Sequence, residues 1–182
     1  MKLQRLTQDY IFKDFDCGNE DLNDFLFNDS KRYMKSRLAV TYIIESEDTT
    51  IGYFSLSNDK LTIREVDKSS WRRIKQLFSH SKHRCDYPAV KVGRLAVDKR
   101  YQGNDIGSDI LNFIKSMFVY ENRTGCVFVT VDALRGSLPF YMKNRFKCID
   151  CKLISQEERE RMRRNYEFMR SIATFDMPEC KI

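Results

Sequence analysis

The feature that most constrains the fold of this chain is a strand that runs through a glycine-containing loop into a helix. The apolar-leaning segment Val90–Val97 is typical of a strand, and Ser108–Tyr120 has the periodicity of an amphipathic helix. Its apolar stripe consists of Ile110, Leu111, Ile114, Met117 and Phe118. A loop at 98–106 joins the two, and Gly103 and Gly107 bracket its turn into the helix, where free backbone N–H groups readily bind phosphate. The spacing alone is weak evidence, because many such turns use glycine only to reverse the chain.

The segments before this unit predict strands and helices in turn. Acidic Glu20 and Asp21 suit the start of a helix whose apolar residues recur from Leu22 to Tyr33. A second helix is predicted at Ser69–Phe78, with Ser69 or Ser70 as its N-cap. We expect strands at Lys2–Leu6, at Leu38–Glu45 and Thr50–Ser57 as a hairpin, and, after a polar connection at 57–59, at Lys60–Val66.

The segments after it continue the alternation. A basic loop leads to Tyr87-Pro88 before the unit, and Cys126–Val131 beyond it reads as a fully buried strand. We expect a short helix at Leu138–Lys143 and strands at Phe146–Leu153 and Tyr166–Phe175. The chain has no internal repeat and no Gly/Ser linker, so residues 1–182 predict one layered domain of the α/β or α+β class.

Composition narrows the setting and the chemistry. The N-terminus has no apolar signal region and no apolar run approaches the roughly 20 residues of a membrane span, so a cytoplasmic protein is expected. Six scattered cysteines fit reduced thiols. No metal site is expected, because Cys148 and Cys151 form a lone C-x-x-C and His80, His83 and Cys85 lack a fourth ligand. The net charge of +6 favours an anionic partner, either nucleic acid or a phosphate-rich cofactor.

Residues flanking the loop resemble those of the GNAT-type acetyltransferases. The loop Gln102-Gly103-Asn104-Asp105-Ile106-Gly107 is similar to that family's Q/R-x-x-G-x-G/A pyrophosphate loop, and the segment GRLAVDKRYQG, which leads into it, resembles the family's fourth strand. Downstream, Val131-Asp132-Ala133, Phe140-Tyr141 and Lys143–Phe146 resemble the family's V-D-A…F-Y-x-K-N-G-F pattern. Upstream, Phe15–Gly18 followed by Leu22 and Phe25-Leu26 resembles a branch that contains toxins acetylating aminoacyl-tRNA.

The resemblance implies a GNAT fold, in which helices flank a mixed, central, splayed sheet, and an acetyl-CoA-dependent N-acetyltransferase. Acetyl would pass directly to a primary amine, and Tyr141 matches the tyrosine that returns a proton to the CoA thiolate. Tyr141 reads otherwise as a core aromatic beside Phe140. The pantetheine arm would pair with main-chain groups of the strand residues Leu95, Ala96 and Val97. The pyrophosphate would be held by backbone amides of the loop residues Gln102, Gly103, Asn104, Asp105, Ile106, Gly107 and Ser108.

Two positions depart from the family pattern. Asp105 stands where the family has the first glycine of G-x-G, and a carboxylate beside a pyrophosphate is unfavourable unless it points to solvent. Arg145 stands where glycine follows K-N, so Asn144 or Arg145 must take up the conformation that glycine allows. These departures leave open a second function, a GNAT-like binding module with lost or weakened catalysis that binds RNA or a protein partner.

The general base is missing from its usual strand. Asp98 is a candidate at the strand's end, although an aspartate there more often caps the following turn. An α-amine, with a reference pKa near 7.7–8.0, is substantially neutral at pH 7, whereas a lysine amine is not. The absence therefore favours an α-amine acceptor, either the aminoacyl group of a charged tRNA or a small amine.

Clustered basic residues indicate where RNA would bind. The candidate surface consists of Arg72, Arg73, Lys75, Lys82 and Arg84. A second cluster, Arg159, Arg161, Arg163 and Arg164, is interrupted by glutamates and reads as a solvated helix face. The expected partners are acetyl-CoA and an amine acceptor, without a membrane. A homodimer and an antitoxin partner are left open.

Overall fold

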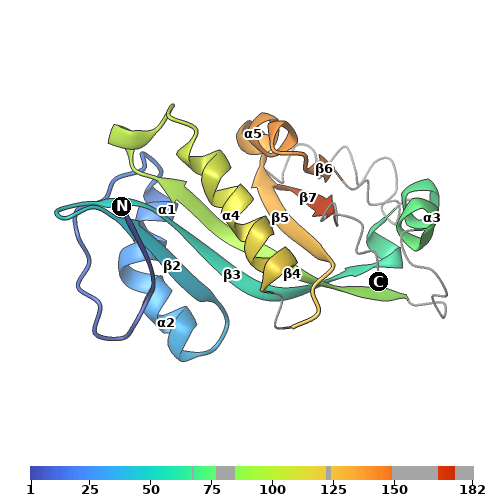
Figure 1. Ribbon diagram of the computed structural model, residues 1–182, viewed down its shortest axis with the longest axis horizontal. Coiled ribbons are helices and arrows are strands. Elements are labelled where there is room, and N and C mark those ends of the chain that lie inside the picture. The colour runs from blue at the N-terminus through green and yellow to red at the C-terminus, as the bar shows by residue number, and fades with distance from the viewer. Residues whose placement is uncertain (67, 77–84, 122–123, 149–167, 175–182) are drawn as a thin grey trace. The chain divides into compact units, whose positions relative to one another are not determined.

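The computed structural model describes residues 1–66, 68–76, 85–121, 124–148 and 168–174 (Figure 1). The chain divides into two compact units, which are described separately. Met1–Asn58 and Lys91–Glu121 form unit 1, and Asp59–Val90 with Asn122–Ile182 form unit 2. The expectation of one domain over 1–182 stays a prediction. Within the described ranges, no helix is long and apolar enough to cross a membrane.

The strands of unit 1 pair in the order β1-β2-β3-β4. They are β1 Lys2–Arg5, β2 Val40–Glu45, β3 Thr50–Thr62 and β4 Asp86–Val97, the last two running on into unit 2. β1 pairs antiparallel with β2, and β2 antiparallel with β3, with Ile43 opposite Tyr53. The expected hairpin is thereby confirmed.

Helices cover both faces of the sheet in unit 1. Neighbouring residues of a strand point to opposite faces, and here Tyr53 stacks on Phe25 at 6.1 Å while Phe54 meets Phe113 at 6.2 Å. Phe25 belongs to one helical segment, made of α1 Glu20–Asp24, a π-helical turn at Phe25–Asp29 and α2 Ser30–Lys35. Phe113 belongs to α4 Ile106–Tyr120 (Figure 1). The helix expected from Glu20 to Tyr33 is confirmed, and Asn19 caps it by accepting a hydrogen bond from Leu22 N at 3.0 Å.

Unit 2 contains the remaining described elements. They are α3 Lys68–Gln76, β5 Phe128–Leu134, α5 Leu138–Lys143, β6 Lys147–Cys148 and β7 Phe168–Thr174. Its strands pair in the order β4-β5-β7-β6, with β7 antiparallel to both neighbours. Trp71 and Ile74 of α3 are buried with Tyr87 and Phe128, so the apolar face of the helix forms part of this core. The helix expected at Leu138–Lys143 is confirmed at both ends.

Several expected boundaries are wrong, for local reasons. No polar connection separates two strands at 57–59: β3 continues to Thr62, with Asn58 and Lys60 exposed and Leu61 buried, so the polar residues alternate with period two. β4 already includes Tyr87-Pro88, β5 begins at Phe128 instead of Cys126, and α3 begins at Lys68, which places Ser69 and Ser70 inside the helix. The parts of the predicted strands at 149–153, 166–167 and 175 lie outside the described residues.

Candidate functional site

The loop between β4 and α4 forms a turn suited to binding an anion. A short 3-10 turn at Lys99–Tyr101 follows β4, and α4 begins at Ile106. Gly103 has φ +81°, and a Cβ built there would meet no atom within 4 Å. The N-cap of α4 is Asp105, which has φ +56° and makes no side-chain capping hydrogen bond. The first turn of a 15-residue helix therefore presents backbone amides that the N-cap side chain does not take up.

Asp105 has the left-handed conformation that the family's glycine would adopt easily. The αL region is less costly for aspartate than for most residues, because its short polar side chain tolerates it. The side chain of Asp105 is exposed. The position thus has a backbone conformation that glycine favours, while adding a carboxylate to the turn at 102–108.

Asp98 caps the turn after β4 and forms an ion pair. Its carboxylate accepts hydrogen bonds from the backbone N of Arg100 at 2.9 Å and from that residue's Nε and Nη2 at 2.8 Å each. It also accepts one from the backbone N of Asp16 at 2.9 Å, and only 1% of the residue is exposed. Hydrogen bonds from Arg100 and the backbone hold the pKa of Asp98 well below its ordinary value. Asp98 is therefore a capping and pairing residue, and a poor general base.

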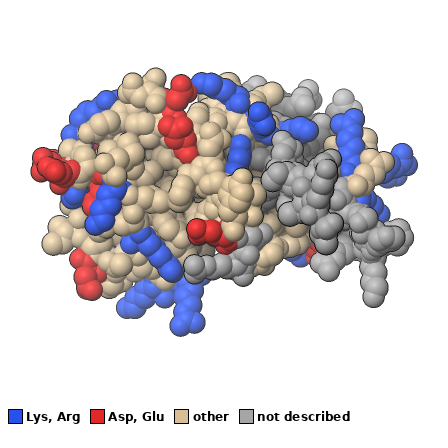
Figure 2. All heavy atoms as spheres, viewed as in Figure 1, with Lys and Arg blue, Asp and Glu red and all other residues tan. Residues whose placement is uncertain are grey.

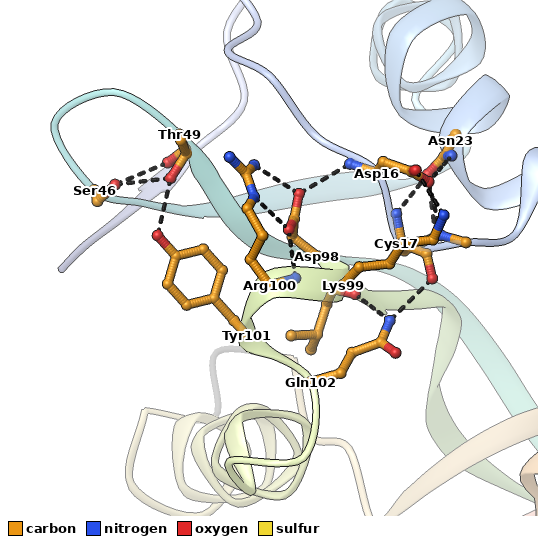
Figure 3. A network of polar contacts seen from close by, with 12 residues as sticks. Asp16, Cys17, Asn23, Ser46, Thr49, Asp98, Lys99, Arg100, Tyr101 and Gln102 are labelled. Atoms are coloured by element: carbon orange, nitrogen blue, oxygen red, sulfur yellow. Dashed lines mark hydrogen bonds and ion pairs between the residues drawn. The ribbon is translucent and has the colours of Figure 1, made fainter.

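The same network joins the loop to the segment before α1 (Figure 3). Lys99 Nζ forms an ion pair with Asp16 at 2.8 Å, and hydrogen bonds from Lys99, Asn23 and Gly18 lower the pKa of Asp16 to about 2. Gln102 Nε2 donates to the carbonyls of Val97 at 2.8 Å and Cys17 at 2.9 Å. The candidate pyrophosphate loop is thus fixed from both sides by side chains of its own unit.

The proposed pantetheine strand is closely packed on one side. Ala96 is 4% exposed, and its carbonyl lies 2.8 Å from where a Cβ on Gly52 of β3 would stand. The carbonyl of Val97 already accepts the Gln102 amide, whereas Leu95 is partly exposed. The absence of a side chain at Gly52 allows β3 to lie against the end of β4.

Tyr141 lies on α5 in unit 2 and is 7% exposed. Burial raises the pKa of its phenol to about 12. The centroid of its ring lies 5.1 Å from that of Phe140 and 5.4 Å from that of Phe146. These are the contacts expected of a core aromatic, the alternative interpretation of Tyr141. The phenol is protonated at neutral pH, as a proton donor must be, and burial makes it a weaker acid than an exposed tyrosine.

The turn after α5 is a Schellman motif in which arginine occupies the usual glycine position. Phe146 N donates to Tyr141 O at 3.0 Å, and Arg145 N donates to Met142 O at 3.0 Å. Arg145 has φ +66°, whereas Asn144 has φ −89°. Of the two residues that could replace glycine, Arg145 adopts the left-handed conformation and the alternative of Asn144 is wrong.

A cavity of about 500 Å³ lies beside the network in unit 1, and its lining does not include residues 102–108. Aromatic and charged side chains alternate around it. Its lining consists of Phe12, Lys13, Asp14, Phe15, Asp16, Phe27, Asp98, Lys99 and Arg100. Lys13, Lys99 and Arg100 are each ion-paired, so the cavity offers no uncompensated cation among these three.

Comparison with known families decides the relationship. The sequence model described as the acetyltransferase (GNAT) domain matches residues 16–157, well over half of the chain. The chain belongs to the GNAT acetyltransferase family. It is accordingly an N-acetyltransferase by family.

Solved structures of toxins share the GNAT fold of this chain. A tyrosine-to-phenylalanine mutant of the AtaT toxin bound to the C-terminus of the antitoxin AtaR matches with a TM-score of 0.67 and 22% identity, covering 96% of this chain and 91% of that chain. A similar mutant of KacT gives 0.68 and 23%, covering 93% and 94%. AtaT complexed with acetyl-methionyl-tRNAfMet gives 0.64 and 23%, covering 83% and 89%. The mixed α/β class predicted from the sequence is confirmed.

Other predicted site residues of this GNAT chain are placed as follows. Arg72 and Arg73 are exposed and Lys75 half-buried on α3, while Lys82 and Arg84 lie outside the described residues. The arginine cluster at 159–164, His80, His83 and Cys151 also lie outside them. Among the residues that the structure does describe, no group of three or more His, Cys, Asp or Glu could hold a metal ion.

The sequence does not predict the polar network that joins Asp16 to Asp98. Asp16 and Asp98 lie 82 positions apart, so no local pattern could pair them. The sequence already indicates that Asp98 caps the turn after β4, but not that the same carboxylate pairs with Arg100. Asp16 was read only as part of the family resemblance, although Gly18 and Asn19 after it are typical of a turn.

Proposed function

We propose that this GNAT protein transfers the acetyl group of acetyl-CoA to the α-amine of an aminoacyl-tRNA. Two features observed together carry the proposal. The turn at 102–108 presents backbone amides, and the carboxylate of Asp98 is already engaged as a cap and in an ion pair with Arg100. The turn fits the pyrophosphate, and the engaged carboxylate favours an acceptor that needs no strong base. The AtaT complex with acetyl-methionyl-tRNAfMet supports this choice of acceptor.

The residues of this chain have separate tasks in that reaction. Acetyl-CoA supplies the acetyl group as a thioester when it is bound. Backbone amides from Gln102 to Ser108 hold its pyrophosphate, and main-chain groups of 95–97 align the pantetheine arm. A backbone N–H near the end of β4 polarises the carbonyl as an oxyanion donor. Tyr141, whose pKa is raised to about 12, donates its proton to the departing thiolate and regains a proton from the one that the attacking amine releases as the amide forms.

Replacement of Tyr141 by phenylalanine tests the assignment. The Tyr141→Phe variant keeps the ring contacts with Phe140 and Phe146, so we expect it to fold and to bind acetyl-CoA with unchanged affinity in calorimetry. Loss of the proton donor should lower kcat on charged tRNA by about 10²- to 10⁴-fold. A variant that retains the wild-type kcat would contradict the role of Tyr141.

Three substrates separate the proposed acceptor from its alternatives. Purified protein is given acetyl-CoA with total charged tRNA, with free amino-acid amides, or with small polyamines. Acetylation of the small amines alone would replace the tRNA acceptor by a small-molecule one. Absence of acetyl-CoA binding at high micromolar concentration would instead support the binding-module function. Repulsion between the carboxylate of Asp105 and the pyrophosphate would then contribute to the loss of acetyl-CoA binding.

The toxin structures also suggest how the activity is controlled. AtaT has been solved bound to the antitoxin AtaR and, as the AtaT–AtaR complex, bound to DNA. We propose by analogy that an antitoxin partner restrains this chain. Expression of the chain alone should then arrest growth, and expression of the Tyr141→Phe variant should not.

A further inference from the structure

Basic side chains gather on α2 and on the turn that follows it. Four of the seven residues from 31 to 37 are lysine or arginine, namely Lys31, Arg32, Lys35 and Arg37. Arg32, Lys35 and Arg37 are exposed, as are the apolar Tyr33 (37%) and Leu38 (60%) between and beyond them. Lys and Arg side chains project in Figure 2 where Figure 1 places α2. These residues, called the α2 basic surface below, combine cationic side chains with an exposed aromatic ring.

The end of α2 keeps an arginine where glycine would fit better. Leu38 N donates to Tyr33 O at 2.9 Å and Arg37 N donates to Met34 O at 3.0 Å, which makes this turn a Schellman motif. Arg37 occupies its left-handed position, with φ +59°. A residue with a Cβ is strained there, and such strain tends to persist at functional sites. The helix dipole alone does not explain Arg37, because Lys35 already places a cation in the last turn.

The four cations differ in the partners that the described residues offer them. Arg32 approaches Asp29 at 3.6 Å, and Lys31 donates to the carbonyl of Tyr10 at 2.8 Å. Among the residues that the structure describes, neither Lys35 nor Arg37 has an ion pair. Exposed uncompensated cations a few residues apart are suited to a polyanion.

A chain of ring contacts connects this surface to β4. The guanidinium of Arg94 lies 5.1 Å from the centroid of the Phe25 ring, and that ring meets Tyr33 edge-on at 5.2 Å. Arg94 is exposed and directly precedes Leu95–Val97 on β4. Unit 1 therefore presents cations from α2 up to the strand on which the acetyl donor is proposed to lie.

We infer that the α2 basic surface, with Arg94, binds the phosphate backbone of an RNA acceptor. The inference rests on the proposed function, since it explains how a charged tRNA would be held while its aminoacyl end reaches β4. Lys35 and Arg37 contact phosphates, and Tyr33 offers a ring on which an unpaired base stacks. Phosphate contacts carry no sequence information, so this surface supplies affinity and leaves the choice of amino acid to other residues.

A double variant tests the surface without damaging the fold. Arg37→Gly removes a charge and relieves the left-handed strain, and Lys35→Ala removes the second charge with a strong helix former. The control, Arg64→Ala with Lys68→Ala, removes two exposed cations from unit 2. Thermal melting should show the double variant to be at least as stable as the wild type.

Binding of uncharged tRNA, followed by fluorescence anisotropy over a salt series, decides the inference independently of catalysis. We expect the double variant to bind about 10-fold more weakly than wild type and its slope of log K against log salt to be shallower by about 1.5. The control should retain the wild-type slope. Equal slopes for wild type and double variant would overturn the inference. It would also be overturned if tRNA binding were weakened by the α3 double variant Arg72→Ala with Arg73→Ala and not by the α2 double variant.

Turnover measurements keep this inference distinct from the proposed function. With charged tRNA, the double variant should show a KM raised about 10-fold, while acetyl-CoA affinity and acetylation of an amino-acid amide stay unchanged. Wild type that binds tRNA but acetylates none would refute the proposed function and leave the surface supported. Loss of a copurifying acidic protein with unchanged tRNA binding would assign the surface to a protein partner and overturn the inference.

Discussion

Three charged residues of the described chain, Arg37, Asp105 and Arg145, hold a left-handed backbone conformation usually occupied by glycine. Arg37 and Arg145 end helices in Schellman motifs, whereas Asp105 begins α4. In the motif after α5, the carbonyl of Tyr141 accepts a hydrogen bond from the backbone N of Phe146, and the ring of Phe146 packs on the ring of Tyr141. The backbone conformation of Arg145 thus helps to place the proposed proton donor.

Asp105→Gly should improve both stability and cofactor binding. Glycine adopts φ +56° without a Cβ penalty, so the free energy of unfolding should rise by up to about 1 kcal/mol, measured by urea unfolding. Removal of the carboxylate from the anion-binding turn should tighten acetyl-CoA binding several-fold in calorimetry. Asp105→Asn separates the two effects, because it removes the charge and retains a side chain that tolerates the αL region. Weaker acetyl-CoA binding by the glycine variant would show that Asp105 assists the site.

Among the elements, the pair β3 and β4 determines the geometry of the candidate site. Gly52 lets the carbonyl of Ala96 approach closely, and the backbone N of Asp98 donates to Ile51 O at 2.9 Å just beyond it. The end of β4, where Leu95–Val97 would align pantetheine, is therefore held by β3 on one side and by the Asp98 cap at its terminus.

Gly52→Ala should disturb this pair. Its Cβ would lie 2.8 Å from Ala96 O, a backbone atom that cannot rotate away, so the strands must separate locally. We expect a loss of about 1–3 kcal/mol in the free energy of unfolding and weaker acetyl-CoA binding. Gly93→Ala is the matched control on β4, because its Cβ would first meet the Ser55 hydroxyl oxygen at 3.4 Å. Equal stability of the two variants would show that β3 and β4 adjust without cost.

For the molecule as a whole, stability should fall in acid. The pKa values of Asp98, Asp16 and Glu45 are all lowered in the folded state, from ordinary values of 3.8, 3.8 and 4.5, chiefly through hydrogen bonds from Arg100 for Asp98 and from Lys99 for Asp16. For Glu45, burial opposes the shift, and the hydrogen bonds from Tyr10 and Lys13 outweigh it. A carboxylate whose folded pKa is lowered stabilises the protein above its unfolded pKa, and that stability is lost as pH falls through the folded value.

Urea unfolding between pH 7 and pH 2.5 measures this loss. We expect the free energy of unfolding to decline once the pH drops below about 4.5, with Asp98, the most buried of the three, accounting for about 2 kcal/mol. Asp98→Asn should be less stable at pH 7 and should show a flatter profile in acid. Parallel profiles for the variant and the wild type would mean that Asp98 makes no linked contribution.

Local sequence determined much of the fold. Periodicity placed the helix at Leu138–Lys143 and the hairpin of β2 and β3, because apolar spacing reflects which face of each element is buried. The polar residues at 57–59 do not end a strand, because they continue the alternation of period two within β3. The starts of α3 and β5 differ from their expected positions by one and two residues, because capping and pairing partners come from elsewhere in the chain.

For the candidate site too, some features follow from the local sequence and others depend on contacts between distant residues. By itself the sequence determined the family pattern, the glycine-containing turn before α4 and the need for residue 144 or 145 to accept a conformation that glycine allows, because glycine positions report backbone conformation directly. Only the tertiary structure decided that Arg145 takes that conformation, that Asp98 is an ion-paired cap, and that Arg94 reaches the α2 basic surface through Phe25. Those outcomes depend on contacts between residues far apart in the chain, which no local pattern encodes.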